Sequence, residues 1–136
     1  MTAQPNDRES EFLKSHRLGV LATSRSSGAP QVSIIAYNFD GNDVVISTGV
    51  QSAKFRNASK RPDVSLIVTD GGQAVTVYGK AQIIRGAESD AIWEQRLQVP
   101  RPANQPARPI PDRGERVVIR FSPEKTFSNR LTESQP

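Results

Sequence analysis

The sequence predicts a mainly β protein: a small closed or half-open antiparallel β-barrel with a few short helices. Six runs rich in β-branched and aliphatic residues follow one another at short, regular spacing, with turn-forming Gly, Pro, Asn and Asp between them. The helical segments are too few and too short for the alternating strand–helix rhythm of a parallel sheet. A chain of 136 residues fits one domain, residues 1–136, with a core of its own.

The N-terminal part of the chain contains one helix and two strands. Residues 7–17 are predicted to be helical, because Asn6 can cap the first turn and Glu9 follows three positions later, as in a capping box. Residues 19–24 and 31–39 have the composition of strands. The segment RSSGAP between them contains the Gly and Pro of a hairpin connection.

Two further strands flank a short helix in the middle of the chain. Residues 44–48 form the third predicted strand, after a turn with the sequence DGND. Residues 52–60 are predicted to form a helix of one to two turns, which ends at Arg61 because Pro62 follows. Residues 64–69, VSLIVT, form the fourth strand.

The fifth strand is long and contains a glycine. It spans residues 73–84, and Gly79 in its middle predicts a close backbone approach or a bend of the kind that barrels need at their corners. Residues 87–98 are predicted to be helical, with a buried stripe formed by Ile92, Trp93 and Leu97.

The C-terminal part combines one strand with two irregular segments. Residues 100–113 contain so many prolines that we expect a surface loop or an extended arm. Residues 116–121, RVVIRF, form the sixth strand, and residues 128–136 are expected to be a flexible tail.

Composition excludes several kinds of chemistry. The chain has no cysteine and one histidine, so disulfides and thiolate catalysis are excluded and a zinc site lacks ligands; no metal site is predicted. No segment approaches the roughly 18 consecutive apolar residues of a membrane span, and the N-terminus lacks a signal peptide pattern, so we expect a cytoplasmic protein. The net charge of +4 is spread singly among acids, with few aromatic residues, which favours a small anionic ligand over nucleic acid.

The segment ISTGVQSAKFRN, residues 46–57, predicts a phosphate site. A strand ends at a glycine, and hydroxyl and basic side chains follow at the start of a helix, where free backbone N–H groups favour an anion. Hydroxyl donors, an ammonium and a guanidinium suit a phosphate. The candidate residues are Thr48, Ser52, Lys54 and Arg56.

Each of these residues also has a purely structural interpretation. Ser52 could serve only as the helix cap, Thr48 as an ordinary strand residue, and Lys54 and Arg56 as solvated charges. Asn57 could brace the turn. Their combination around Gly49 favours a phosphate site, although the two commonest nucleotide-binding loops, GxGxxG and GxxxxGK[ST], are absent.

Several short motifs together resemble a known family. In chain order they are LAT at 21–23, GAPQVS at 28–33, STG at 47–49 with SAK at 52–54, RPDVSL at 61–66 and YGKA at 78–81. Their order and spacing resemble the pyridoxamine 5'-phosphate oxidase-like FMN-binding split barrels, and among these the branch that uses the deazaflavin coenzyme F(420). The resemblance covers nearly all of residues 12–121.

This resemblance implies a six-stranded antiparallel split β-barrel that forms a homodimer, with a cofactor in a cleft between the two barrels. The cofactor phosphate is expected at Thr48, Ser52 and Lys54, helped by Arg56 and Asn57. The tricyclic ring is expected along the backbone of the strand formed by Ser33, Ile34, Ile35 and Ala36.

Two departures from the family pattern affect the expected pocket and the expected activity. Ile34 and Ala36 stand where members often have a proline and an aromatic residue, which implies a wider local pocket. The chain ends in SNRLTESQP without the Arg-Leu-Ala-Pro-like signature of true pyridoxamine phosphate oxidases, which argues against vitamin B6 synthesis.

The resemblance therefore implies a coenzyme F(420)-dependent oxidoreductase that acts on a small conjugated or heteroaromatic substrate. An FMN-dependent oxidoreductase and a non-catalytic cofactor-binding protein are the alternatives. The sequence contains no nucleophile–base pair and no carboxylate dyad, so the cofactor would supply the chemistry and no catalytic residue is assigned. A proton could come from solvent or from a tyrosine such as Tyr37 or Tyr78.

Overall fold

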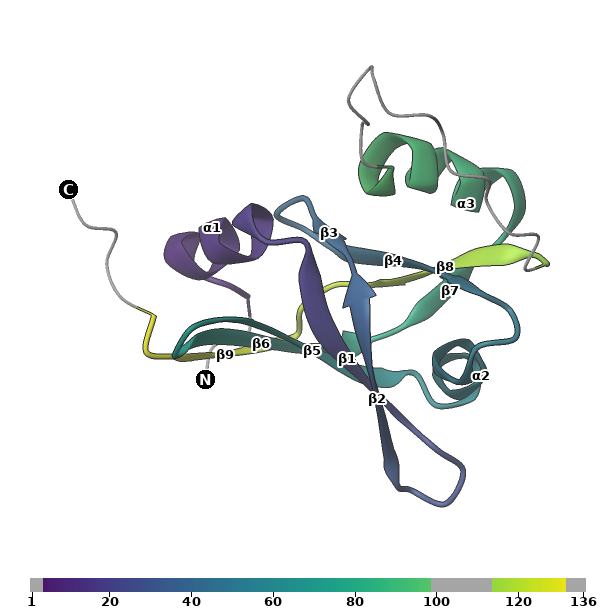
Figure 1. Cartoon of the computed structure of the whole chain (residues 1–136), viewed down its shortest axis with the longest axis horizontal. Helices are drawn as coiled ribbons and strands as arrows, with labels where there is room; N and C mark the ends of the chain where they lie inside the picture. Colours follow the sequence, from purple (N-terminus) through teal and green to yellow (C-terminus); the bar gives the residue numbers. More distant parts are fainter. Residues whose placement is uncertain (1–3, 99–113, 132–136) are drawn as a thin grey trace.

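The computed structural model describes residues 4–98 and 114–131. Two antiparallel sheets face each other and form a mainly β structure with three α-helices along the described chain (Figure 1). The predicted loop or arm at 100–113 lies outside the described residues.

The five-stranded sheet has the order β2-β1-β5-β6-β9. Neighbouring strands are antiparallel throughout. The strands are β1 (Leu18–Ser24), β2 (Pro30–Ala36), β5 (Asp63–Asp70), β6 (Gln73–Lys80) and β9 (Lys125–Asn129).

The four-stranded sheet has the order β3-β4-β8-β7 and is also antiparallel. Its strands are β3 (Asn38–Phe39), β4 (Val44–Gly49), β7 (Gln82–Ile84) and β8 (Arg116–Phe121). No helix in the described part of the chain is long and apolar enough to cross a membrane.

Two of the six predicted strands are each divided between the sheets. The predicted strand 31–39 becomes β2 and β3, which are separated by Tyr37, and the predicted strand 73–84 becomes β6 and β7, which are separated by Ala81. A run of apolar residues continues through each corner, so the pattern alone could not show that the chain changes sheets there.

Gly79 lies at one of these corners, as predicted. A Cβ atom at this position would lie 2.5 Å from the carbonyl oxygen of Ser122 and 2.7 Å from a ring carbon of Phe121. Only glycine therefore permits the close approach of β6 to the end of β8.

The predicted tail from residue 128 begins inside a strand instead. β9 runs beside β6, with Thr126 buried and Phe127 half exposed. This strand was not predicted, because Phe127 is its only large apolar residue and the alternation of apolar and polar residues is therefore weak. Residues 132–136 lie outside the described residues.

The helices begin and end close to their predicted positions. In α1 (Asp7–Ser15), Asn6 and Glu9 form the expected capping box, with bonds of 2.8 and 2.9 Å. Ser52 caps α2 (Ala53–Lys60). The third predicted helix is present as α3 (Gly86–Ile92) followed by a π-helical turn, η1 (Trp93–Leu97).

Among the described residues, the core consists of two clusters. The larger lies between the sheets and includes Leu21, Leu66, Val77 and Phe121, while a smaller one lies between the four-stranded sheet and the α3–η1 segment. Because β4 is covered on both faces, its first three residues are all buried. The chain after β4 then leaves the core at Gly49, where the candidate site begins.

Candidate functional site

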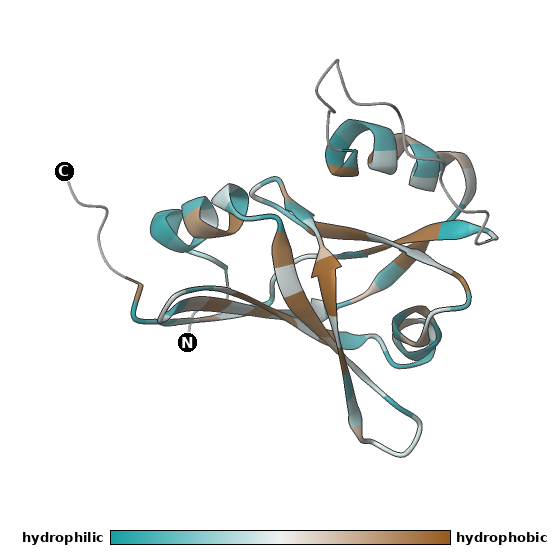
Figure 2. Ribbon diagram, viewed as in Figure 1, coloured by the Kyte–Doolittle hydropathy of each residue, from teal (hydrophilic) through white to brown (hydrophobic). Residues whose placement is uncertain are grey.

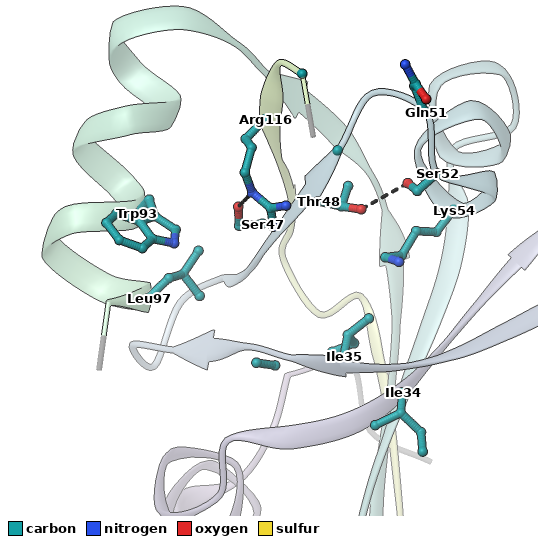
Figure 3. A pocket seen from close by; sticks show the side chains of 13 residues that line it. Ile34, Ile35, Ser47, Thr48, Gln51, Ser52, Lys54, Trp93, Leu97 and Arg116 are labelled. Atoms are coloured by element: carbon teal, nitrogen blue, oxygen red, sulfur yellow. Dashed lines mark hydrogen bonds between the residues drawn. The ribbon is translucent and has the colours of Figure 1, made fainter. Parts of the chain in front are cut away.

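A pocket of about 860 Å³ opens where the ends of β2 and β4, the start of α2 and the η1 turn come together (Figure 3). We call it the β4–α2 pocket. It is lined by Ile34, Ile35, Ala36, Ser47, Thr48, Gly49, Gln51, Ser52, Lys54, Trp93, Leu97, Gly114 and Arg116.

The first turn of α2 is built as the sequence predicts. The Ser52 backbone N–H donates to the Gly49 carbonyl at 3.1 Å, which turns the chain from strand to helix. The Ser52 hydroxyl then accepts from the Phe55 N–H at 3.1 Å, so the structural interpretation of Ser52 as a cap is correct.

The Ser52 hydroxyl also borders the pocket. Thr48 Oγ1 donates to Ser52 Oγ at 2.9 Å (Figure 3), and Thr48 itself is buried. Ser52 Oγ thus accepts two hydrogen bonds, which leaves its own O–H as a donor beside the pocket. Capping and ligand binding are therefore compatible at this residue.

Two cations face the pocket from different elements. Lys54 comes from α2 and Arg116 from the start of β8, and Arg116 Nε donates to Ser47 Oγ at 3.3 Å. The pKa of Lys54 is lowered, first by partial burial and second by the positive charge of Arg116. Within residues 4–98 and 114–131, neither cation forms an ion pair with a carboxylate. An anion in this pocket would relieve their mutual repulsion.

The opposite wall is apolar and comes from β2. Ile35 points into the core, whereas Ile34 and Ala36 are exposed. Since β2 is an edge strand of its sheet, part of its backbone has no ladder partner there and can contact a ligand. The pocket therefore has a cationic side and an apolar side with free backbone polar groups.

The third wall was not assigned to the site by sequence reasoning. Trp93 and Leu97 of η1 were predicted as core residues, but both are only half-buried and line the pocket. Arg116 was also missed. It lies opposite Gly49 in the β4–β8 register, a pairing between residues far apart in the chain that no local pattern indicates.

Six of the nine predicted cofactor residues line this pocket: Ile34, Ile35, Ala36, Thr48, Ser52 and Lys54. The other three do not. The Ser33 hydroxyl is bonded to Gln31 Nε2 at 2.6 Å, and the buried Asn57 amide donates to Thr23 Oγ1 at 3.1 Å. Arg56 lines a separate cleft on another side of α2.

The two tyrosines considered as proton donors lie elsewhere. Tyr37 is buried and donates to the Leu13 carbonyl at 2.6 Å, and burial raises its pKa well above the ordinary value, so it is held as a structural residue. Tyr78 is exposed on the five-stranded sheet and lines a different pocket.

The fold and the pocket define the class of protein: an antiparallel split barrel with a pocket at the edge of one sheet that is lined by two cations. A family model described as Pyridoxamine 5'-phosphate oxidase matches residues 6–130. The chain belongs to this family.

Several solved structures share the fold. An F420 reductase is 25% identical with a TM-score of 0.68, covering 87% of this chain and 94% of that one. A conserved hypothetical protein from Mycobacterium tuberculosis is also 25% identical, with a TM-score of 0.69 and coverage of 98% and 93%. A pyridoxamine 5'-phosphate oxidase-related FMN binding protein from Nostoc punctiforme is 16% identical, with a TM-score of 0.62 and coverage of 87% and 78%.

Family membership supports the assignment of this protein to the flavin-binding oxidoreductases. It leaves open whether the cofactor is FMN or coenzyme F(420), since both kinds of protein occur among the structural neighbours.

Proposed function

We propose that the protein is a coenzyme F(420)-dependent oxidoreductase that transfers a hydride between the cofactor and a small conjugated or heteroaromatic substrate. The observation that carries the proposal is the β4–α2 pocket itself. It combines two cations without acidic partners, among the described residues, with an apolar wall next to free strand backbone. The phosphate of such a cofactor matches the cationic side of the pocket, and its flat ring matches the apolar side.

The residues of the pocket divide into two groups by their chemistry. Thr48, Ser52 and Lys54 would hold the phosphate, and we add Arg116 to this group because it lines the same pocket and its charge acts on Lys54. The backbone of Ile34, Ile35 and Ala36 would contact the ring. Bound there, the cofactor supplies the hydride chemistry, while these residues bind and orient it.

The choice of the deazaflavin over FMN rests on similarity. The F420 reductase is 25% identical to this chain, whereas the FMN binding protein is 16% identical. The same phosphate residues would serve FMN, so an FMN-dependent oxidoreductase is the second candidate.

We also propose that the active form is a homodimer. Apolar side chains, interrupted by Thr76, form a row across the outer face of the five-stranded sheet, because Ile34 pairs with Val20 and the register continues through Ile67 and Thr76 to Phe127. The middle of this row is half-buried and its two ends are exposed. Ile34 is 79% exposed and Phe127 is 50% exposed. Figure 2 shows the apolar colour along β1 and β2 on this sheet. A second copy would cover the row and border the pocket at Ile34.

The test is a parallel titration of the protein with coenzyme F(420) and with FMN, followed by fluorescence. Trp93 is the only tryptophan and lines the pocket, so a ligand bound there should quench it. Tighter binding of coenzyme F(420), followed by turnover of a heteroaromatic acceptor with the reduced cofactor, is the expected result. Tighter binding of FMN would favour the second candidate, binding without turnover with any acceptor would indicate a carrier, and binding of neither would overturn the proposal.

A further inference from the structure

A second cleft lies beside the β4–α2 pocket, along α3 and η1. Its volume is about 480 Å³, within the usual range for a small ligand. We call it the α3 cleft. It is lined by Ser47, Ser89, Asp90, Trp93, Glu94 and Arg116. Three of these residues, Ser47, Trp93 and Arg116, also line the β4–α2 pocket, so the two spaces share one wall.

One side of the continuous α3–η1 helix supplies most of the lining. It contributes Ser89, Asp90, Trp93 and Glu94. Positions 89 and 93, like positions 90 and 94, are one helical turn apart, so the four side chains project from the same side. Trp93 points from the helix toward the strand that carries Ser47 (Figure 3). The cleft thus combines an aromatic side chain with two carboxylates.

The two carboxylates have no counter-charge within ion-pairing distance. Over residues 4–98 and 114–131, neither Asp90 nor Glu94 forms an ion pair. Like charges four positions apart on a helix repel each other. Arg116 is the one cation among the described lining residues, and a phosphate in the β4–α2 pocket would offset its charge. A cation bound in the α3 cleft would relieve the repulsion between the carboxylates.

A buried hydroxyl gives a second, independent indication of a ligand. Ser89 is only 3% exposed, and it lines the cleft. Its hydroxyl forms no hydrogen bond with any of the described residues, unlike the Ser59 hydroxyl in α2, which donates to the Phe55 carbonyl one turn earlier. Since buried polar groups normally have a partner, the Ser89 hydroxyl is available to a polar atom in the cleft.

A purely structural role explains the acidic residues less well. Acidic side chains stabilise a helix in its first turn, and Glu88 takes that position in α3. Asp90 and Glu94 lie beyond this turn, where the dipole effect has faded. Both are exposed, and solvation alone would satisfy them. Solvation does not account, however, for the buried Ser89 hydroxyl on the same side of the helix.

We propose that the α3 cleft is the substrate compartment of the cofactor pocket, and that it takes a planar conjugated molecule that carries a positively charged nitrogen. Asp90 and Glu94 would bind the nitrogen, and the ring would lie against Trp93. The Ser89 hydroxyl would accept a hydrogen bond from an N–H group of the ligand. This inference names the substrate class of the proposed oxidoreductase and rests on that function, whereas binding in the cleft can be measured without the cofactor.

The test uses three small molecules that share a ring and differ in charge: benzamidine is the cation, benzamide the neutral molecule and benzoate the anion. Affinity is measured by calorimetry, and the site is mapped by amide chemical shifts. We expect benzamidine to bind at least about tenfold tighter than the other two, the ratio that one charge-assisted contact gives. Its binding should shift the amides of residues 88–95.

The double variant Asp90→Asn/Glu94→Gln removes both charges with little change of shape. It should lower the affinity for benzamidine at least about tenfold. Glu11→Gln/Glu88→Gln removes the same charge from exposed positions outside the cleft and should change the affinity less than about twofold. Thermal unfolding of each variant confirms that it is folded.

Ser89→Ala tests the hydroxyl separately. It should also weaken the binding of benzamidine, while the midpoint of thermal unfolding stays unchanged, because the hydroxyl has no partner among the described residues. Unchanged affinity in this variant would remove Ser89 from the site.

Titration with coenzyme F(420) and with FMN, with and without benzamidine, separates this inference from the proposed function. We expect a cofactor and benzamidine to bind together. If benzamidine binds in the cleft and neither cofactor binds, the proposed function fails while the cation site remains. If a cofactor binds and benzamidine does not, this inference fails while the proposed function remains.

Three results would overturn the inference. The first is equal affinity for benzamidine and benzamide, or no binding of either at millimolar concentration, and the second is an equal loss in the two double variants. The third is competition between benzamidine and the cofactor, because benzamidine would then occupy the β4–α2 pocket.

Discussion

Ser52 has two roles that a single hydroxyl can fulfil. It caps α2 by accepting from the Phe55 N–H, and it accepts from Thr48 at the edge of the pocket. A substitution at Ser52 would therefore change both stability and binding, since loss of a cap costs about 1 kcal/mol. Lys54 is a cleaner probe of the pocket, because it forms no ion pair within the described chain.

We expect Lys54→Met to weaken cofactor binding by about 1.5–3 kcal/mol, through the loss of one charge-assisted bond to the phosphate. Fluorescence titration of Trp93 measures the affinity. Lys60→Met on the same helix is the matched control, because Lys60 lies outside the β4–α2 pocket. Unchanged affinity in Lys54→Met, with Lys54→Met/Ser52→Ala also unchanged, would contradict the phosphate site.

The pH dependence of binding follows from the lowered pKa of Lys54. A phosphate requires the ammonium form, so affinity should fall as pH rises through the Lys54 pKa, and this fall should begin at a lower pH than an ordinary lysine would give. Arg116→Gln removes one cause of the shift, so the pKa should rise and the alkaline fall should move to higher pH. Titration of affinity against pH in both proteins tests this, and a shift in the opposite direction would refute it.

At the scale of elements, Arg96 anchors the η1 turn that carries Trp93 and Leu97. Its guanidinium donates to Asn38 Oδ1 at 2.8 Å, to Asp43 Oδ1 at 2.7 Å and to the Asp43 carbonyl at 3.0 Å. The side chains of Arg96 and Asp43 are each only 20% exposed. One residue thus ties a wall of the pocket to the β3–β4 hairpin.

Replacing Arg96 with Met should lower the free energy of unfolding by about 1–3 kcal/mol, because it leaves Asp43 with fewer partners in a partly buried site. The emission of Trp93 should shift to longer wavelength as the turn loosens. Arg85→Met is the control: it breaks the exposed Arg85–Glu115 pair, which should contribute little to stability because water screens it. Equal losses of stability in the two variants would show that the Arg96 contacts stabilise the protein no more than an exposed ion pair does.

The corner at Gly79 can be tested in the same way. Gly79→Ala should destabilise the protein by about 1–3 kcal/mol, because the added carbon meets backbone that cannot move away easily. Gly72→Ala is the matched control, since a Cβ there would approach only Arg130 side-chain atoms at 3.7 Å. Thermal or urea unfolding measures both, and a tolerated Gly79→Ala would mean that the corner relaxes.

At the scale of the whole molecule, the apolar row on the five-stranded sheet predicts self-association. Val32→Lys/Phe127→Lys places two charges on this face, at residues that do not line the pocket, and should convert the dimer to a folded monomer. Sedimentation equilibrium measures the mass, and Asn42→Lys in the exposed β3–β4 turn is the control. A wild-type protein that is monomeric at micromolar concentration would contradict the proposed dimer.

The sequence by itself determined the three helices and most of the strand segments, but not β9, and it grouped Thr48, Ser52 and Lys54 at one place. Capping at Asn6 and Ser52, the hairpin turns and the close approach at Gly79 are local effects, because each depends on residues near in the chain or on the special freedom of glycine. The family resemblance, which the match over residues 6–130 confirms, added the split barrel.

Only the tertiary structure decided which side chains share the pocket. It brought Arg116 beside Lys54 and placed Trp93 and Leu97 on the pocket wall, and it placed Asn57 and Arg56 at a separate cleft on another side of α2. These positions depend on strand register and on where the chain changes sheets. Both are set by packing between residues far apart in the sequence, which local patterns of hydrophobicity and charge do not encode.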